Sequence, residues 1–415
     1  MSDIWTIILY VIIFLSLYVQ VFFLFSFLKN RKNLFKETSD KDVDFFPSVS
    51  FLVPCWNESA TLRRTMESIF SLEYPKDKLN IVIIDDGSSD DTWRIMQSYK
   101  DNTRIKLLKK ENGGKHTALN LGLENANTEL LASVDADTIL DKKALLEIVK
   151  YFKNTEIAAV GGSILIENPS SFVGKAQSVE YQMNSYIKKM LGFTGGVLVA
   201  PGAFSVFRTD AVKKVGGYRE GNNQEDLELT FRIQTNHMKV DHCHTAFAFT
   251  KGPSTIRSLF RQRVRWSRGF LGNVLEYKEA IFNKKFGNFG MFSLPIGIMN
   301  YLAVFYVFSF SWVYFFKNIL LKIEEVNLVG FEASSAVSNF FKFDLFFFDT
   351  RALSFLVPLI HIFLIFSIFV GMRLAKSKVS PSSLFCFGVV YSFVPIFWNI
   401  KSVYYTVMAK MPSWR

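Results

Sequence analysis

A pair of carboxylates follows an apolar run in a position suited to binding a cation. Asp135 and Asp137 come directly after the apolar residues 130–134. Side chains two residues apart in an extended chain point to the same side, so both can reach one ion. Mg²⁺ and Mn²⁺ prefer oxygen ligands and commonly bridge a protein carboxylate and a substrate diphosphate. We interpret the two aspartates as candidate metal ligands, while a solvated turn is the alternative for such a pair.

Two further polar segments follow predicted elements. Asp85 and Asp86 end the apolar run 79–84 and precede a Gly-Ser turn. They are either turn residues or acceptors of hydrogen bonds from a base or a ribose. Lys115 follows two glycines at the start of a predicted helix, 114–125. A helix N-terminus with a lysine favours an anion such as a diphosphate, although a plain helix start explains the segment when it is taken alone.

A third pair of acids opens the predicted helix 227–233. Glu225 and Asp226 stand at its N-terminus, where a carboxylate often only interacts with the helix dipole. The same position also suits a general base that removes the proton of an attacking sugar hydroxyl. The sequence therefore offers Asp226 as a candidate catalytic base, with Glu225 beside it.

The segment 262–266 has the pattern Q-x-x-R-W. Arg265 suits a diphosphate leaving group, and Trp266 offers a flat surface to a sugar ring. The surrounding stretch 251–285 is rich in Lys and Arg and precedes an apolar segment. A basic amphipathic helix on anionic lipid accounts for most of these charges. Nucleic-acid binding is disfavoured because this basic stretch adjoins an apolar segment.

Strands and helices alternate over residues 48–166, upstream of these acids. The predicted strands are 48–54, 79–84, 104–108, 130–134 and 158–166, and the predicted helices between them are 59–72, 90–99, 114–125 and 142–152. This alternation predicts a parallel sheet between two helix layers. Ligands bind at the carboxyl ends of such strands, where Asn57 and Glu58 join the acids named above.

Four apolar segments are long enough to cross a bilayer. They cover 4–28, 286–316, 352–372 and 379–400. Basic residues in 29–41 and 373–378 predict that these flanks and the region 29–289 are cytoplasmic. The Phe-rich loop 317–351 is interpreted as interfacial, with a re-entrant segment as the alternative.

The predicted domains follow from these segments. They are an N-terminal membrane helix (1–28), a basic linker (29–47), an α/β domain (48–250), basic interfacial helices (251–285) and a C-terminal membrane region (286–415).

Composition excludes several classes of protein. The 415 residues are 49% hydrophobic and 20% charged, which excludes a disordered or collagen-like chain. The net charge is +11, and the three cysteines lie far apart without metal-binding spacing. A disulfide framework is therefore not expected, and the polar part is predicted to lie in a reducing compartment. His242 and His244 lack a second ligand pair, so we prefer a plain strand to a zinc site.

Taken in order, these motifs resemble the processive family-2 glycosyltransferases. That family makes cellulose, chitin, hyaluronan and poly-N-acetylglucosamine in membranes. The matching segments are 53–58, 85–88, 113–115, 135–137, 225–226 and 262–266. The resemblance implies an α/β GT-A (Rossmann-like) domain on the cytoplasmic side of a multi-pass membrane protein.

The resemblance also implies a role for each site residue. A UDP-sugar would be contacted by Pro54, Asn57, Glu58, Asp85, Asp86, Lys115 and Asp135, with the uridine on Asp86 or Asp85. Asp137, assisted by Asp135, would hold Mg²⁺ or Mn²⁺. Asp226 would be the base beside Glu225. The diphosphate and acceptor would lie against Gly202, Gln262, Arg265 and Trp266.

Departures from the family pattern narrow the expected product. Gln224 stands where many members have Thr, and 199–204 lacks the Phe-Cys-Gly-Thr form of cellulose synthases. The compact chain is more similar to poly-N-acetylglucosamine synthases, so we expect a growing β-linked polysaccharide. Four spans are few for a polymer pore, so export would need an export partner or a homo-oligomer. The alternatives are a transferase that adds one sugar to a lipid acceptor, and a non-catalytic membrane scaffold or channel subunit.

Overall fold

The computed structural model describes residues 3–35, 44–329 and 353–410. The chain divides into two compact units. One contains the described residues of 1–25 and 298–366, and the other contains those of 26–297 and 367–415. The second unit holds the sheet and every candidate site residue.

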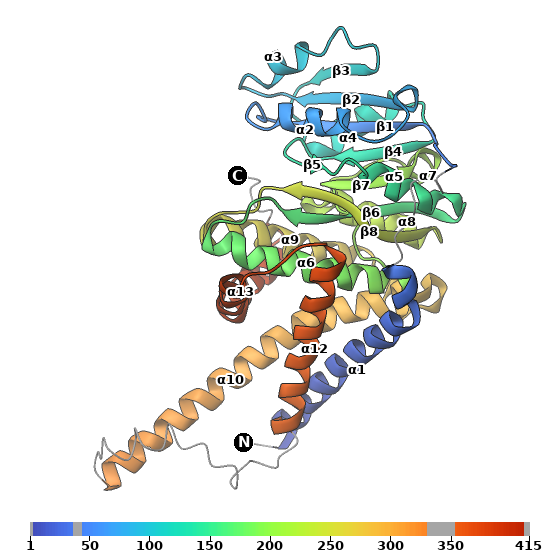
Figure 1. Ribbon diagram of the computed structural model, residues 1–415. Helices are drawn as coiled ribbons and strands as arrows, with labels where there is room; N and C mark the ends of the chain where they lie inside the picture. The colour runs from blue at the N-terminus through green and yellow to red at the C-terminus, as the bar shows by residue number, and fades with distance from the viewer. Residues whose placement is uncertain (1–2, 36–43, 330–352, 411–415) are drawn as a thin grey trace. The chain divides into compact units, whose positions relative to one another are not determined.

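The second unit is built on a mixed sheet of eight strands within the described residues. Their order is β3-β2-β1-β4-β7-β6-β8-β5 (Figure 1). The strands are β1 (Val49–Cys55), β2 (Leu79–Asp86), β3 (Ile105–Lys110), β4 (Leu130–Val134), β5 (Ile139–Leu140), β6 (Ile157–Ile166), β7 (Phe204–Arg208) and β8 (Lys239–Thr250).

The strands predicted over 48–166 all run in one direction, as expected, but the sheet also contains antiparallel strands that the sequence did not predict. β1, β2, β3 and β4 are parallel to one another, but β7 runs antiparallel to both β4 and β6. β7 starts opposite the last residue of β4, with Phe204 paired to Val134. The chain therefore enters β7 at the edge where β4 ends, and this brings the residues just before β7 next to those just after β4.

Helices cover both faces of the sheet. They are α2 (Leu62–Phe70), α3 (Thr92–Gln97), α4 (Lys115–Glu124), α5 (Ala144–Val149), α6 (Phe172–Thr194), α7 (Thr209–Lys214), α8 (Glu225–Thr235) and α9 (Ile256–Glu276). Single turns lie at Lys76–Lys78, Lys150–Lys153, Gly221–Asn223, Lys278–Ala280 and Lys284–Phe286, and a π turn lies at Phe289–Ser293.

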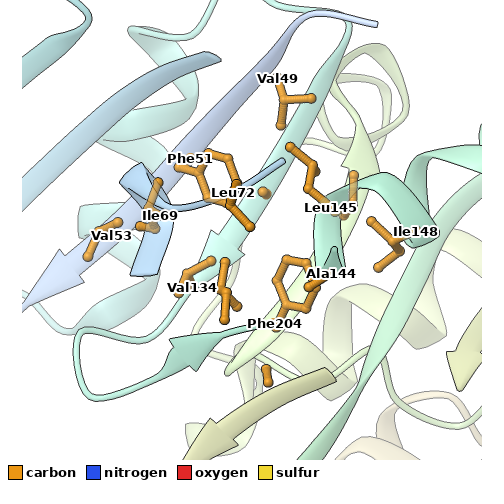
Figure 2. Close-up of a cluster of buried hydrophobic side chains, with 14 of the residues drawn as sticks. Val49, Phe51, Val53, Ile69, Leu72, Val134, Ala144, Leu145, Ile148 and Phe204 are labelled. Carbon is orange, nitrogen blue, oxygen red and sulfur yellow. The ribbon is translucent and has the colours of Figure 1, made fainter. Parts of the chain in front are cut away.

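Two hydrophobic clusters separate these layers. Phe51 and Val53 of β1 face one cluster, together with Ile69 of α2 and Leu145 of α5 (Figure 2). Leu52, the residue between them, belongs to the cluster on the opposite face. Because successive side chains of a strand point in opposite directions, β1 contributes to both hydrophobic clusters. Packing on both faces fixes the position of the polar residues that follow its carboxyl end.

Two C-terminal helices pack against the helices beside the sheet. α13 (Pro381–Phe393) packs on α6, and α14 (Pro395–Val407) packs on α9. Their shared apolar cluster consists of Val173, Ala176, Leu259, Val264, Cys386, Val390 and Trp398. This cluster gives the Q-x-x-R-W helix a fixed support on the side away from the sheet.

Among the described residues, three helices are long and apolar enough to cross a membrane. They are α1 (Asp3–Leu34), α10 (Leu294–Val329) and α12 (Leu353–Leu374). The predicted fourth span, 379–400, forms the pair α13 and α14, which is bent by 41° where Pro395 interrupts the helical hydrogen bonds. Residues 317–329 of the predicted loop belong to α10, and the Phe-rich run 340–348 lies outside the described residues.

Candidate active site

The acids that follow β1, β2 and β4 meet at one edge of the sheet. The strands are parallel and in register, so their carboxyl ends lie together, with Cys55 of β1 opposite Asp85 of β2. Asn57 stands just after β1 in the left-handed region, with φ at 56°. Its backbone N–H donates to Ser88 Oγ across 3.0 Å, and its Oδ1 accepts from Ser89 N across 2.8 Å. These bonds join the first two loops of the site.

The loop after β1 contributes two more predicted residues. Pro54 lies within β1, opposite Ile84. The backbone N–H of Glu58 donates to Thr92 Oγ1 across 2.8 Å, and the Glu58 carboxylate accepts from Thr61 Oγ1 across 2.7 Å. Glu58 is therefore held through both its backbone and its side chain beside the edge of the sheet.

The two aspartates at the end of β2 have different surroundings. Asp86 Oδ1 accepts from Lys110 Nζ across 2.7 Å and from Gly113 N across 3.0 Å, and its Oδ2 accepts from Gly114 N across 2.9 Å. Asp85 Oδ1 accepts from Ser88 N across 3.0 Å, while its buried Oδ2 has no hydrogen-bond partner in the part of the chain that is described. Asp86 thus organises the glycine loop, while one buried carboxylate oxygen of Asp85 has no partner among the described residues.

Gly87 is the residue that allows this arrangement. Its φ is +73°, and a Cβ atom built there would lie 2.6 Å from the backbone nitrogen of Asn112. Asn112 in turn donates its side-chain amide to Asp86 O across 3.0 Å. A side chain at position 87 would separate the two loops, so glycine is required by both conformation and space.

The Asp135–Asp137 segment forms a tight turn at the end of β4. Thr138 N donates to Asp135 O across 3.0 Å, and the buried Thr65 of α2 donates its hydroxyl to Ala136 O across 2.9 Å. Asp135 N donates to Ala203 O across 3.4 Å. The turn is therefore held from α2 and from the residues that lead into β7.

Lys115 connects the acids after β4 to those that open α8. Its Nζ lies 2.6 Å from Asp135 Oδ1 and 2.8 Å from Glu225 Oε1. Burial lowers the pKa of Lys115, but the carboxylates of Asp135, Glu225 and Asp226 outweigh burial and raise the pKa above its ordinary value. The ammonium of Lys115 is thus paired with two carboxylates, and the diphosphate contact expected for it from the sequence stays a prediction.

Asp226 lies at the first turn of α8 with both carboxylate oxygens engaged. Its Oδ2 accepts from Gly202 N across 2.8 Å, and its Oδ1 accepts from Leu227 N across 2.8 Å. Burial and the neighbouring Glu225 raise the pKa of Asp226, while Lys115 and the two backbone N–H groups oppose the rise. A carboxylate with a raised pKa is a better proton acceptor near neutral pH, which is the property a general base needs.

Gly202 fits between the two acidic segments only because it lacks a side chain. A Cβ atom at this position would lie 2.7 Å from Lys115 Nζ and 3.4 Å from Asp226 Oδ2. The backbone thus approaches the Lys115 bridge closely enough for its N–H to reach the carboxylate of Asp226.

Asp137 has the electrostatic surroundings of a cation ligand. Burial, then the carboxylates of Asp135 and Glu58, raise the pKa of Asp137 to about 6, while Lys115 and Thr138 lower it. A divalent cation would relieve this repulsion between carboxylates. Among the described residues, no three or more His, Cys, Asp or Glu side chains are grouped as a metal site. The two aspartates therefore suit a cation that takes its remaining ligands from substrate and water.

The Q-x-x-R-W residues lie on α9, which packs against the start of α8. Arg265 Nη1 donates to Asn223 O across 3.4 Å, two residues before Glu225. A Cβ atom on Gly269 of α9 would lie 2.6 Å from Gln224 Cγ. Gln262 Oε1 is buried without a hydrogen-bond partner among the residues described, and Trp266 is half-buried. The helix thus brings Arg265 to the segment that leads into Asp226.

The lipid interpretation of the basic stretch does not hold for all of its arginines. Arg263 and Arg268 are buried in protein. Arg263 pairs with Glu180 of α6, and Arg268 donates to Asn222 and to Lys410 O. By contrast, the exposed basic side chains are Lys251, Arg257, Arg261, Lys278, Lys284 and Lys285. The sequence alone did not separate these groups because the burial of Arg263 and Arg268 depends on contacts with distant segments of the chain.

Comparison with known proteins shows the family of the chain. The family model described as "Glycosyl transferase family 2" matches residues 50–216. A poly-β-1,6-N-acetyl-D-glucosamine synthase from Staphylococcus epidermidis is 33% identical over 310 residues, which cover 73% of this chain and 71% of that protein. A protein of the same name from Staphylococcus aureus is 30% identical over 306 residues, with the same coverage of each chain.

A solved structure shares the fold. A mannosyltransferase from Pyrobaculum calidifontis, in complex with GDP-Man and Mn²⁺, aligns with a TM-score of 0.61 at 16% identity and covers 97% of this chain and 99% of that chain. The predicted fold class, a GT-A domain with apolar helices, is thereby confirmed. The chain belongs to glycosyl transferase family 2 and is a glycosyltransferase.

Proposed function

We propose that this enzyme transfers N-acetylglucosamine from UDP-N-acetylglucosamine to the growing end of a β-1,6-linked polysaccharide. The two staphylococcal relatives carry that activity in their names. The observation that supports catalysis most directly is the half-buried Asp226, which has a raised pKa, accepts from two backbone N–H groups and adjoins Glu225 of the Lys115 bridge.

The donor is proposed to bind at the edge formed by β1, β2 and β4. Asp85 offers its buried, free Oδ2 to the nucleotide, and Asp86 holds the glycine loop beside it. Asp137 and Asp135 would hold Mg²⁺ or Mn²⁺ against the diphosphate. A bound cation would stabilise the negative charge that develops on the departing UDP.

Asp226 is proposed to take the proton from the acceptor hydroxyl. The hydroxyl oxygen then forms a bond to the anomeric carbon as the bond from that carbon to the UDP oxygen breaks. One displacement inverts the configuration, so an α-linked donor gives a β-linked product. Arg265, held near Asn223, would add positive charge beside the leaving group, and Trp266 would support the acceptor sugar.

The membrane arrangement belongs to the same proposal. The catalytic unit is placed in the cytoplasm, where nucleotide sugars are made, and the apolar helices are placed in the cell membrane as a multi-pass anchor. Export of the polymer is proposed to use a homo-oligomer or an export partner, because three or four apolar helices are few for a pore.

A donor screen with product analysis tests the proposal. Full-length enzyme in detergent would be given UDP-N-acetylglucosamine, UDP-glucose or UDP-glucuronate, with Mg²⁺, Mn²⁺ or EDTA. We expect cation-dependent UDP release with UDP-N-acetylglucosamine alone, and a product ladder whose linkage is β-1,6 by NMR. Turnover of another donor, or a product that stops after one added sugar, would contradict the proposed function.

A further inference from the structure

A buried ion pair joins α6 to the helix that carries Trp266. Arg263 donates to both carboxylate oxygens of Glu180, across 2.7 and 2.6 Å. The two side chains are only 10% and 12% exposed. Tyr391 of α13 donates its hydroxyl to Glu180 as well. The charge of Arg263 is therefore neutralised inside the protein, and this arginine is not available to a diphosphate.

The same guanidinium supports the Trp266 indole. The central carbon of the Arg263 guanidinium lies 4.5 Å from the centre of the Trp266 ring. A cation over an indole face is attracted by the ring and restricts its rotation. The guanidinium occupies one face of the indole, and the acceptor contact proposed above would use the other. The position of this face then depends on how firmly Arg263 is held.

We propose that Glu180 and Tyr391 are positioning residues for the acceptor sugar. Through Arg263 they hold the Trp266 indole at the angle at which it supports the acceptor, and this role rests on the function proposed above. Without the Glu180 carboxylate, Arg263 would be a buried charge lacking its partner and would turn towards water. The indole would then lose its support on one face.

Packing alone does not account for this cluster. Val173, Leu259, Val264 and Val390 already join α6, α9 and α13 through apolar contacts. Replacing a buried ion pair by apolar side chains of similar volume is often neutral or stabilising. A bidentate pair with a third hydrogen bond lies one turn from the indole that is proposed to support the acceptor. The orientation that the pair imposes therefore explains it better than stability does.

The test measures acceptor affinity in the full-length enzyme. β-1,6-linked N-acetylglucosamine oligomers would be titrated by calorimetry, and their KM and the KM for UDP-N-acetylglucosamine would be measured in parallel. We expect Glu180→Gln to weaken oligomer binding about tenfold while the donor KM changes less than about twofold. Tyr391→Phe should also weaken oligomer binding, by a smaller factor. If Glu180→Gln fails to fold, the oligomer affinity of Tyr391→Phe tests the positioning role.

A matched control comes from a second cluster of the same composition. Tyr277 donates to Glu228 across 2.6 Å, and Glu228 pairs with Arg232 across 2.7 Å. Tyr277→Phe therefore removes the same kind of hydrogen bond away from Trp266, and we expect its oligomer affinity to equal that of the wild type. Unchanged affinity in both Glu180→Gln and Tyr391→Phe would overturn the positioning role. A wild type that binds the oligomer but never extends it would overturn the proposed function instead.

Discussion

The ammonium of Lys115 lies 2.8 Å from the carboxylate of Glu225, and this contact joins two parts of the chain that are far apart in sequence. Lys115 opens α4, and Glu225 opens α8 beside the proposed base. The same ammonium contacts Asp135. One side chain thus connects the turn proposed to hold the cation to the residues proposed to activate the acceptor.

Replacing Lys115 by Met should remove this connection. Three buried or half-buried carboxylates would then repel one another without a cation, so we expect a loss of about 3 kcal/mol in the free energy of unfolding. UDP release should fall about 100-fold, because the turn at Asp135 and the Glu225 side chain beside the proposed base would no longer be joined. Thermal unfolding and a UDP-release assay measure the two effects.

The control is Lys239→Met, which removes an ion pair with Glu156 in which both side chains are more than half exposed. Its activity should match that of the wild type. Normal turnover by Lys115→Met would show that the bridge has no role in the reaction.

Gly202→Ala should reduce turnover without unfolding the protein. The added methyl would lie 2.7 Å from Lys115 Nζ, so either the ammonium shifts from Asp135 and Glu225 or the Gly202 N–H moves away from Asp226. We expect kcat to fall about tenfold or more. Gly388→Ala is the control, since its Cβ would meet nothing within 4 Å. Equal activity of the two variants would contradict the close approach.

Asp86→Asn should weaken donor binding through the glycine loop. The amide can no longer accept from Gly113 N, Gly114 N and Lys110 together, so we expect the Kd for UDP to rise about tenfold. Asp91→Asn removes an exposed pair with Arg94 and should leave the Kd unchanged. Calorimetric titration with UDP measures both, and equal Kd values would refute the role of Asp86.

Acid should destabilise the fold partly through His244. Burial, and then the charge of Lys189, lower the pKa of His244 to about 4, below the 6.5 of an exposed histidine. The unfolded chain therefore binds this proton first. The contribution of His244 to the free energy of unfolding is complete above about pH 6.5. It is lost as the pH falls towards 4, by up to about 1.4 kcal/mol per pH unit.

The matching measurement compares wild type with His244→Gln, using unfolding midpoints at several pH values. The wild type should lose more stability than the variant between pH 6.5 and 4. The exposed His237, changed to Gln, serves as the control and should leave the wild-type pH dependence intact. Parallel pH profiles for wild type and His244→Gln would refute the assignment.

The sequence predicts the parallel half of the fold well, for a physical reason. Strands such as Leu130–Val134 are fully buried, so they are continuous apolar runs that end in polar residues. β7 was missed because it is short and carries no periodic pattern of its own; its place follows from pairing with β4. A single sequence does not show which strands pair with each other in the sheet.

The site residues also divide into those that the sequence predicts and those whose partners come from distant segments of the chain. Asp135 and Asp226 are predicted by type and by their place at an element's end. Lys110 was missed as the partner of Asp86, although a lysine that ends the neighbouring strand was a usable signal. Glu180 lay in a long helix without a motif, and its pairing with Arg263 depends on how α6 packs on α9.

Replacing Asp226 by Asn removes the proposed base and gives the sharpest test of the mechanism. The amide keeps the size of the side chain but cannot take a proton, so sugar transfer should fall by about 100- to 10,000-fold. The Kd for UDP should stay within about twofold of the wild-type value, because the nucleotide is assigned to Asp85 and its loops. Sustained polymer synthesis by Asp226→Asn, measured as sugar incorporated per UDP released, would contradict the account.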